Sequence, residues 1–214
     1  MQREQLKNAK ILLSILFTLI GLIMIFYSYF AGVKNNVFNK KNIELLEQQV
    51  LITESIDEVN EEDFDNTTVD LEDMVGADRV DAYIGYLSVP DVDIKRGFVN
   101  INSKYNSVGY NVMLIEGSKM PDQDKGNLIL AAHRGNSSVS FFDKLYKLKD
   151  NAKAYITYQG KVYEYELRNS YLEPKDGELT IRRNPNVNTL TLITCTRNDK
   201  TTQTIFIFEL VSVV

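Results

Sequence analysis

The first strong pattern along the chain is an uncharged, almost wholly apolar stretch from Ile11 to Val33. At about 1.5 Å rise per residue, a helix of this length crosses a hydrocarbon layer of about 30 Å. The stretch is longer than the apolar core of a cleavable signal peptide, and its end, Ser28-Tyr29-Phe30-Ala31, lacks the small-x-small pattern of a cleavage site. It therefore predicts a retained transmembrane anchor over residues 11–33, preceded by a short tail of residues 1–10.

The next region, residues 34–82, has the pattern of a tether. Apolar positions between Ile43 and Ile52 follow helical spacing, and the chain then becomes acidic and irregular from Asp57 to Asp73. Residues 44–81 hold fourteen acids against one base, Arg79, a local net charge of -13. Such composition is typical of a solvated segment, so we predict a short helix followed by an acidic spacer.

From Tyr83 onward the pattern changes to short β-rich runs. Alternation through Ile84-Gly85-Tyr86-Leu87-Ser88-Val89 followed by Pro90 predicts a strand that ends at residue 89. Further strands are predicted over residues 112–115, 126–132, 154–158, 162–171, 189–194 and 204–211. Many short strands with few helices indicate a closed or sandwiched all-β domain over residues 83–214.

Two local features refine this domain. Residues 139–148 carry Phe141, Phe142, Leu145 and Leu148 at spacing that predicts a short helix. Residues 158–161 join two alternating runs and predict a hairpin turn in which Gly160 takes a positive φ.

Composition limits the classes of function. The 214 residues are 44% hydrophobic and 25% charged, which suits one folded domain plus accessory segments. The net charge of -5 leaves +8 outside the acidic region, but the bases are scattered and no nucleic-acid motif is present, so no nucleic-acid partner is expected. We also expect no cofactor and no metal, because three nearby acids, Glu173, Asp176 and Glu178, have the pattern of a solvated loop.

Candidate chemistry lies at the ends of two apolar runs. The run Thr191-Leu192-Ile193-Thr194 ends at Cys195, the chain's only cysteine, and Leu128 to Ala132 ends at His133, its only histidine. A thiolate paired with an imidazole is a competent nucleophile, and the imidazole can donate a proton to a departing amine. This reading requires folding to bring the two strands side by side. Otherwise Cys195 is a buried structural thiol and His133 an ordinary core or surface histidine.

The element Thr191-Leu192-x-Thr194-Cys195, with Ala132-His133-Arg134-Gly135 placed 62 positions earlier, resembles the signature of the sortases, the membrane-anchored cysteine transpeptidases of Gram-positive bacteria. The likeness extends over most of residues 83–214, including Glu116-Gly117-Ser118 before the histidine strand. It implies a sortase-like eight-stranded β-barrel with one or two short helices. It also implies cleavage of an LPXTG-like sorting signal between threonine and glycine, followed by transfer to an amine.

The resemblance assigns roles and partners as well. His133 and Cys195 become the catalytic pair, with substrate contacts expected at Thr194 and Ala132. Segment 171–188 is expected to help form the substrate groove through Leu179 and Ile181, for which ordinary packing is the alternative. The implied partners are surface proteins with a C-terminal sorting signal and an amine acceptor, either a peptidoglycan precursor or a pilin lysine. The implied location is the plasma membrane, single-pass, with the short tail cytoplasmic and the catalytic domain extracellular.

One part of the family pattern is missing. Sortases use an arginine on the strand after the cysteine to orient substrate and stabilise the oxyanion, but here Gln203 or Thr204 occupies that position. Arg197, two residues beyond Cys195, is the expected substitute because its guanidinium can reach back over the site. Lower-ranked candidates are Arg134, Arg182 and Arg183.

Two alternatives stay open. One is a membrane-tethered cysteine peptidase that hydrolyses its acyl-enzyme, and the other is a catalytically weak sortase-like binding or scaffold protein. The sortase class is not assigned, although no DPW-type lid motif precedes the barrel.

Overall fold

The computed structural model describes residues 2–57 and 82–214. It contains one long helix, α1 (Gln2–Asp57), two short 3-10 helices and eight strands within these residues. The strands are β1 (Tyr83–Val89), β2 (Ile94–Val99), β3 (Met113–Leu114), β4 (Asn127–Ala131), β5 (Lys153–Tyr158), β6 (Lys161–Pro174), β7 (Thr189–Cys195) and β8 (Thr202–Val213). The 3-10 helices are η2 (Pro90–Val92) and η3 (Leu145–Lys147).

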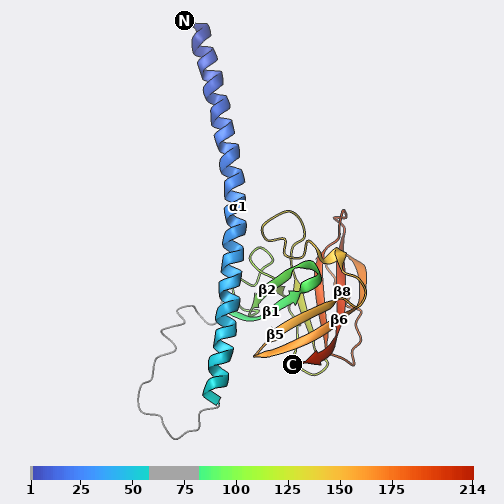
Figure 1. The fold of residues 1–214 in the computed structure, drawn as a ribbon. Helices are drawn as coiled ribbons and strands as arrows, with labels where there is room; N and C mark the ends of the chain where they lie inside the picture. Colours follow the sequence, from blue (N-terminus) through green and yellow to red (C-terminus); the bar gives the residue numbers. More distant parts are fainter. Residues whose placement is uncertain (1, 58–81) are drawn as a thin grey trace, which may run out of the picture.

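The strands form one sheet in the order β2-β1-β5-β6-β8-β7-β4-β3. Its two end strands, β2 and β3, contact each other, so the sheet curls into a nearly closed barrel (Figure 1). Neighbouring strands are antiparallel except for the parallel pair β4 and β7. The prediction of an all-β barrel that follows a long, apolar N-terminal helix in the sequence is confirmed.

Two apolar layers surround strand β7. Leu190 and Leu192 lie in the barrel interior, in the main core with Phe98, Tyr165 and Phe208. On the opposite face, Ile193 packs in a second cluster with Ile129, Ile205 and Ile207. Because both faces are covered, six of the seven β7 residues are buried, and only the terminal Cys195 is partly exposed.

The predicted strands were found, with small differences at their ends, but strand β2 was missed. Lys95, Arg96 and Gly97 interrupt its hydrophobic alternation, and only the backbone pairing with β1 defines it as a strand. The hairpin at residues 158–161 is confirmed, with φ of 48° at Gln159 and 76° at Gly160.

The helix predicted over residues 139–148 is wrong. Only η3 forms there, because Phe142 and Leu145 turn inward to the main core and most of the segment runs as turns over the barrel.

A separate short helix over residues 43–52 is also wrong, because these residues belong to the continuous α1. No proline or glycine lies between residues 34 and 57 to stop the helix. The acidic stretch 58–81 lies outside the described residues. The division of the N-terminal region into tail, anchor and tether stays a prediction.

The second half of α1 docks against the outside of β1 and β2 (Figure 1). Asn39 is the polar centre of this junction. Its Oδ1 accepts hydrogen bonds from Gly97 N at 3.0 Å and from the Tyr83 hydroxyl at 3.3 Å, and its Nδ2 donates to Lys95 O at 3.0 Å. Ile43 forms the apolar part of the contact with Tyr83 and Val99.

Tyr83 joins the helix to the barrel only because β2 has a glycine beneath its ring. A Cβ on Gly97 would lie 2.0 Å from the Tyr83 ring, so any other residue would displace it. The ring's one hydroxyl proton is shared between Asn39 Oδ1 and Asn111 Oδ1, which is the nearer at 2.9 Å. Burial raises the pKa of Tyr83 to about 12, so the hydroxyl stays a neutral donor at physiological pH.

Ile43→Ala should loosen the helix from the barrel. The Ile43 side chain is 3% exposed, and truncating such a side chain costs about 2–5 kcal/mol. Amide exchange in β2 of the full chain in detergent should therefore accelerate, most of all at Gly97. Leu45→Ala is the matched control because Leu45 is 47% exposed on the same helix. Equal exchange in both variants would show that the helix does not dock as described.

Candidate active site

The parallel pair β4 and β7 brings the two predicted residues to one place. Their register has a constant offset of 62 positions, from Asn127 opposite Thr189 to Ala131 opposite Ile193. A further hydrogen bond from Ala132 N to Ile193 O, at 3.2 Å, carries the pairing past the end of β4. The same offset of 62 positions relates His133 to Cys195, two residues beyond the last pair of the ladder.

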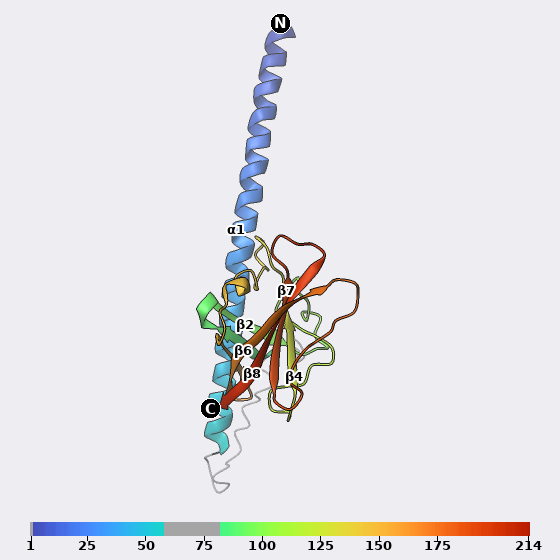
Figure 2. The same cartoon turned by 90° about the vertical axis from the view of Figure 1, so that its right-hand side faces the viewer.

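Each of these residues directly follows a buried one, Ala132 before His133 and Thr194 before Cys195. Cys195 is partly exposed and forms no disulfide, and His133 is exposed. Figure 2 shows the loop that follows β7 at the upper end of the barrel. Side chains alternate between the faces of a strand, so Cys195 points to the same face as Ile193. The thiol therefore lies on the outer face of the barrel wall, at the end where both strands stop.

Thr194 and Ala132, predicted to contact substrate, point into the barrel. Both are buried, and the Thr194 hydroxyl donates to the Ala132 carbonyl oxygen at 3.0 Å. This bond ties the end of β7 to the segment that carries His133. Direct contact of these two residues with substrate stays a prediction.

A groove of about 380 Å³ lies on the same outer face. The residues that line it come from the strand wall and from the segment between β6 and β7: Ile115, Ala131, Lys175, Gly177, Glu178, Leu179, Ile193 and Gln203. Leu179 lines the groove, whereas Ile181 packs against the second apolar cluster, and contact of either with substrate stays a prediction. Gly177 turns the loop with φ of 98°, which favours glycine.

The structure adds a charged residue that the sequence did not indicate. Lys175 Nζ lies 3.3 Å from Cys195 Sγ and donates to it. Lys175 follows the last residue of β6, and its backbone N donates to Thr201 O at 2.9 Å. Because β8 pairs with both β6 and β7, Glu173 and Cys195 both lie opposite Gln203, and the lysine reaches the thiol across β8. No local sequence signal marks this lysine, which precedes the cysteine by twenty positions.

Arg197 and Arg134 share one aromatic ring. The Arg197 guanidinium carbon lies 4.4 Å from the centroid of Tyr146, and that of Arg134 lies 5.4 Å from it. Arg134 is the residue after His133, and Arg197 lies two residues after Cys195. Tyr146 therefore connects the loop after His133 with the loop after Cys195. Cation–π contacts of this kind stabilise by about 0.5–1 kcal/mol at exposed sites.

The remaining arginine candidates are engaged elsewhere. Arg182 pairs with Glu173 at 3.2 Å, and Arg183 donates to the backbone oxygens of Asn184, Val187 and Lys125.

At the family's arginine position, Gln203 lies opposite Cys195 and Thr204 lies opposite Thr194. Thr204 Oγ1 is held by Thr196 Oγ1 at 3.0 Å. Gln203 also lines the groove and offers a neutral amide donor beside the thiol.

The loop after Cys195 is organised by Asp199. Its Oδ1 accepts hydrogen bonds from Thr201 N at 2.8 Å and Thr201 Oγ1 at 2.6 Å, and its Oδ2 accepts from Thr202 Oγ1 at 2.6 Å. These bonds lower the pKa of Asp199 to about 2. Because the pKa of Asp199 in the folded protein is below the ordinary value of 3.8, the ionised carboxylate stabilises the folded state. This stabilisation is fully present above pH 3.8 and is lost as pH falls through about 2.

The family comparison agrees with this geometry. A sortase domain model matches residues 87–210, more than half of the chain, so the chain belongs to the sortase family of cysteine transpeptidases. It is 28% identical over 202 residues to sortase A of Listeria monocytogenes, covering 89% of this chain and 86% of the relative.

Solved sortase structures share the fold. A lid mutant of sortase A from Corynebacterium diphtheriae superposes with a TM-score of 0.55 at 24% identity, covering 64% of this chain and 73% of that one. Sortase C1 from Streptococcus agalactiae gives 0.53 at 25% identity, covering 61% and 68%. Sortase A and sortase C structures match this chain to a similar degree, so the comparison does not assign a sortase class.

Asp199→Ala should loosen the loop between β7 and β8 while the barrel stays intact. Three hydrogen bonds that hold Thr201 and Thr202 are lost, so amide exchange over residues 196–202 should accelerate at neutral pH. Asp143→Ala, on another loop, is the control and should leave this exchange unchanged. Unaltered exchange in Asp199→Ala would mean that the carboxylate does not organise the loop.

Proposed function

We propose that this protein is a sortase that cleaves an LPXTG-like sorting signal through a thioester on Cys195 and transfers the acyl group to an amine. The observation that supports the proposal is the register of β4 and β7, whose offset of 62 positions, continued past the end of β4, relates His133 to Cys195. The proposed substrates are surface proteins with a C-terminal sorting signal. The proposed acceptor is the amine of a peptidoglycan precursor or a pilin lysine.

The reaction follows from the two side chains. The Cys195 thiolate attacks the carbonyl carbon of the threonine–glycine bond, the C–N bond breaks, and His133 as imidazolium donates a proton to the departing amine. The product is a thioester on Cys195. An incoming amine then gives its proton to His133 and attacks the thioester carbonyl, and the C–S bond breaks to regenerate the thiolate.

The groove beside the thiol suits an extended, partly apolar peptide. Ile115, Ala131 and Ile193 supply an apolar wall, and Leu179 lies on the opposite loop. The peptide in this groove would run past the thiol, with its scissile bond at the end of β7. Binding there orients the bond for attack, which is the main contribution of a positioning groove to rate.

Two cations are proposed to share the role of the missing strand arginine. Lys175, at 3.3 Å from Sγ, stabilises negative charge on the sulfur by charge pairing. Arg197 is proposed to face the carbonyl oxygen when substrate is bound, and its stacking on Tyr146 keeps the guanidinium beside the cysteine loop. Separate groups therefore serve the thiolate and the oxyanion.

The apolar first half of α1 is proposed to be a single-pass anchor in the plasma membrane, with the barrel outside. In the described residues, α1 is the one helix long and apolar enough to cross a membrane, and its apolar window is not buried by the barrel. The flanking charges are balanced: Arg3, Lys7 and Lys10 precede the span, and Lys34, Lys40 and Lys41 follow it. The extracellular orientation thus rests on the family resemblance.

A second function is favoured by one observation, the lack of an arginine on β8. Without that charge the site would hold a sorting signal without turning it over, as a scaffold does. A third outcome is hydrolysis, in which water resolves the thioester.

Incubating the full chain in detergent with a Leu-Pro-X-Thr-Gly peptide should produce a mass increase on Cys195, the chain's only cysteine. An added amine should convert the adduct to a peptide–amine product, whereas a hydrolase would release the free acid in either case. Cys195→Ala should form no adduct, and His133→Ala should react about 10²–10⁴-fold more slowly. Peptide binding with no adduct on the wild-type thiol would favour the scaffold instead.

Lys175→Met should slow alkylation of Cys195 by iodoacetamide at neutral pH. Loss of one charge close to the sulfur should reduce the rate roughly fivefold, the effect of an exposed charge pair about 4 Å apart in water. Lys175→Arg should retain most of the rate. Lys200→Met, which removes an exposed lysine from the neighbouring loop, is the control. If Lys175→Met and Lys200→Met both react like the wild type, the ammonium does not act on the thiol.

A further inference from the structure

The end of the apolar span is in contact with the barrel. Helix residues from the last part of that stretch form one wall of a cavity of about 540 Å³, and the loop between β2 and β3 forms the other. The helix wall consists of Tyr27, Phe30, Ala31, Lys34, Asn35 and Phe38. The loop wall consists of Tyr105, Tyr110 and Asn111. The end of the apolar span therefore lies directly beside the folded domain.

Helix geometry fixes the depth of this cavity. A hydrocarbon core about 30 Å thick takes about 20 helical residues, so a span that starts at Ile11 ends near Phe30. Tyr27, Tyr29 and Phe30 then lie at the boundary between hydrocarbon and headgroups, where aromatic residues gather in membrane proteins. Tyr105 and Tyr110 share a cavity with Tyr27 and Phe30 and must lie at nearly the same depth.

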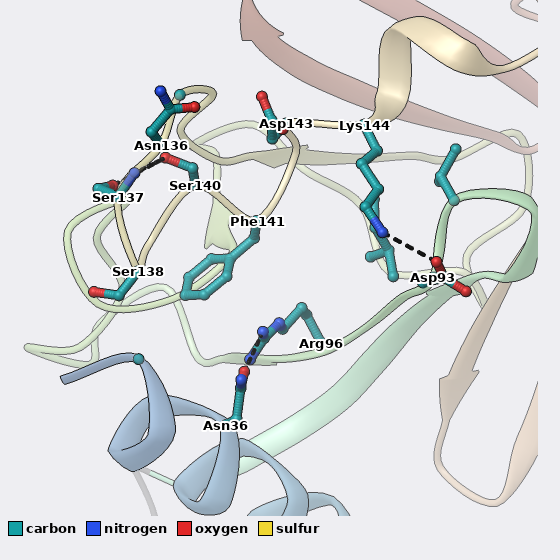
Figure 3. A pocket seen from close by; sticks show the side chains of 14 residues that line it. Asn36, Asp93, Arg96, Asn136, Ser137, Ser138, Ser140, Phe141, Asp143 and Lys144 are labelled. Carbon is teal, nitrogen blue, oxygen red and sulfur yellow. Dashed lines mark hydrogen bonds and ion pairs between the residues drawn. The ribbon is translucent and has the colours of Figure 1, made fainter. Parts of the chain in front are cut away.

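A second loop reaches the same level beside the helix. Gly32 and Asn36 line a cavity of about 490 Å³ together with Ser137, Ser138 and Phe141, from the loop that follows His133 (Figure 3). Ser138 Cβ lies 3.7 Å from the position that a Cβ on Gly32 would take.

Arg96 closes the base of this cavity. It donates to Asn36 Oδ1 at 2.6 Å, and its guanidinium carbon lies 4.5 Å from the centroid of the Phe141 ring. Arg96, on β2, thus connects α1 to the loop that follows His133.

The chemistry of this end of the molecule suits a lipid surface. Tyr110 is 62% exposed, and Ile101 and Tyr105 are partly exposed on the same loop. Residues 27–41 and residues 94–112 each carry three bases and no acid, although the chain as a whole has a net charge of -5. Amphipathic aromatic side chains surrounded by bases are the composition expected at the headgroup layer of an anionic membrane.

We propose that the β2–β3 loop, residues 100–112, is a membrane-contact surface that rests in the headgroup layer beside α1. This rests on the proposed function in one respect, the insertion of α1 into a bilayer. The docking of Asn39 and Ile43 on the barrel fixes the height and tilt of the domain.

Figures 1 and 2 draw the loop between β7 and β8 at the upper end of the barrel, towards the N-terminal half of α1. The Cys195 end of the barrel consequently faces the bilayer, and the groove opens close to the membrane surface.

The chain contains no tryptophan, so a single tryptophan can report its own depth. Three full-length variants in vesicles of phosphatidylcholine and phosphatidylglycerol are compared, with lipids brominated at the headgroup end or the middle of the acyl chain. Phe17→Trp tests the span, Tyr110→Trp tests the loop, and Val211→Trp is an exposed control on β8 near the C-terminus. Unaltered circular dichroism confirms that each variant folds.

Phe17→Trp should be quenched most by deep bromines and Tyr110→Trp most by shallow ones, with a blue shift of emission in both. Val211→Trp should be neither quenched nor shifted. A quenched Phe17→Trp with an unquenched Tyr110→Trp would overturn the membrane-contact proposal and leave the anchor intact. An unquenched Phe17→Trp would overturn the anchor itself and the contact surface with it.

Discussion

The structure depends on one backbone interaction, the parallel pairing of β4 with β7. The pairing joins two segments 62 positions apart, and its register, continued past Ala131 and Ile193, leads to His133 and Cys195. A slip of one residue would turn the imidazole to the other face of the wall. Burial specifies the register strongly, because Ile129 and Ile193 must share one apolar layer while Leu128 and Leu192 lie in the other. The apolar packing that stabilises the barrel therefore also positions the candidate catalytic pair.

Much of the fold could be predicted from the sequence, because most strands are bounded by clear signals. Pro90 ends β1, Gly160 turns the β5–β6 hairpin, and two apolar runs end on the chain's only histidine and cysteine. Strand β2 was not predictable in this way, since its polar residues face α1 and solvent and its pairing is a property of the backbone.

The surroundings of the thiol were less accessible to prediction. Lys175 reaches Cys195 across β8 only after two antiparallel pairings have formed, and no local pattern encodes that contact. The contact of Arg197 with Tyr146 is equally invisible to local patterns, because the ring lies 51 positions earlier in the chain. The sequence indicated the nucleophile and its partner, whereas the charges around them depend on tertiary contacts.

Helix α1 packs directly against the barrel, and the composition of the helix changes with height above the proposed membrane. After the polar residues 2–10, α1 carries apolar residues, then bases at residues 34–41, and then acids from Glu44 onward. The contacts of Asn39, Ile43 and Arg96 hold the barrel beside the basic part. A site held in this way would meet membrane-bound reactants at a fixed distance, without a search through the volume that a flexible tether would allow.

The central claim, that sulfur and imidazole meet in one accessible cleft, can be tested directly because the chain has one cysteine and one histidine. The measurement is the nitrogen and proton chemical shifts of the His133 ring, recorded at fixed pH before and after alkylation of Cys195. A clear shift of the ring resonances on alkylation is predicted, with the backbone resonances of β5 unchanged. Ring resonances that do not move would show that the two groups are apart, and the proposed acyl transfer would lose its physical basis.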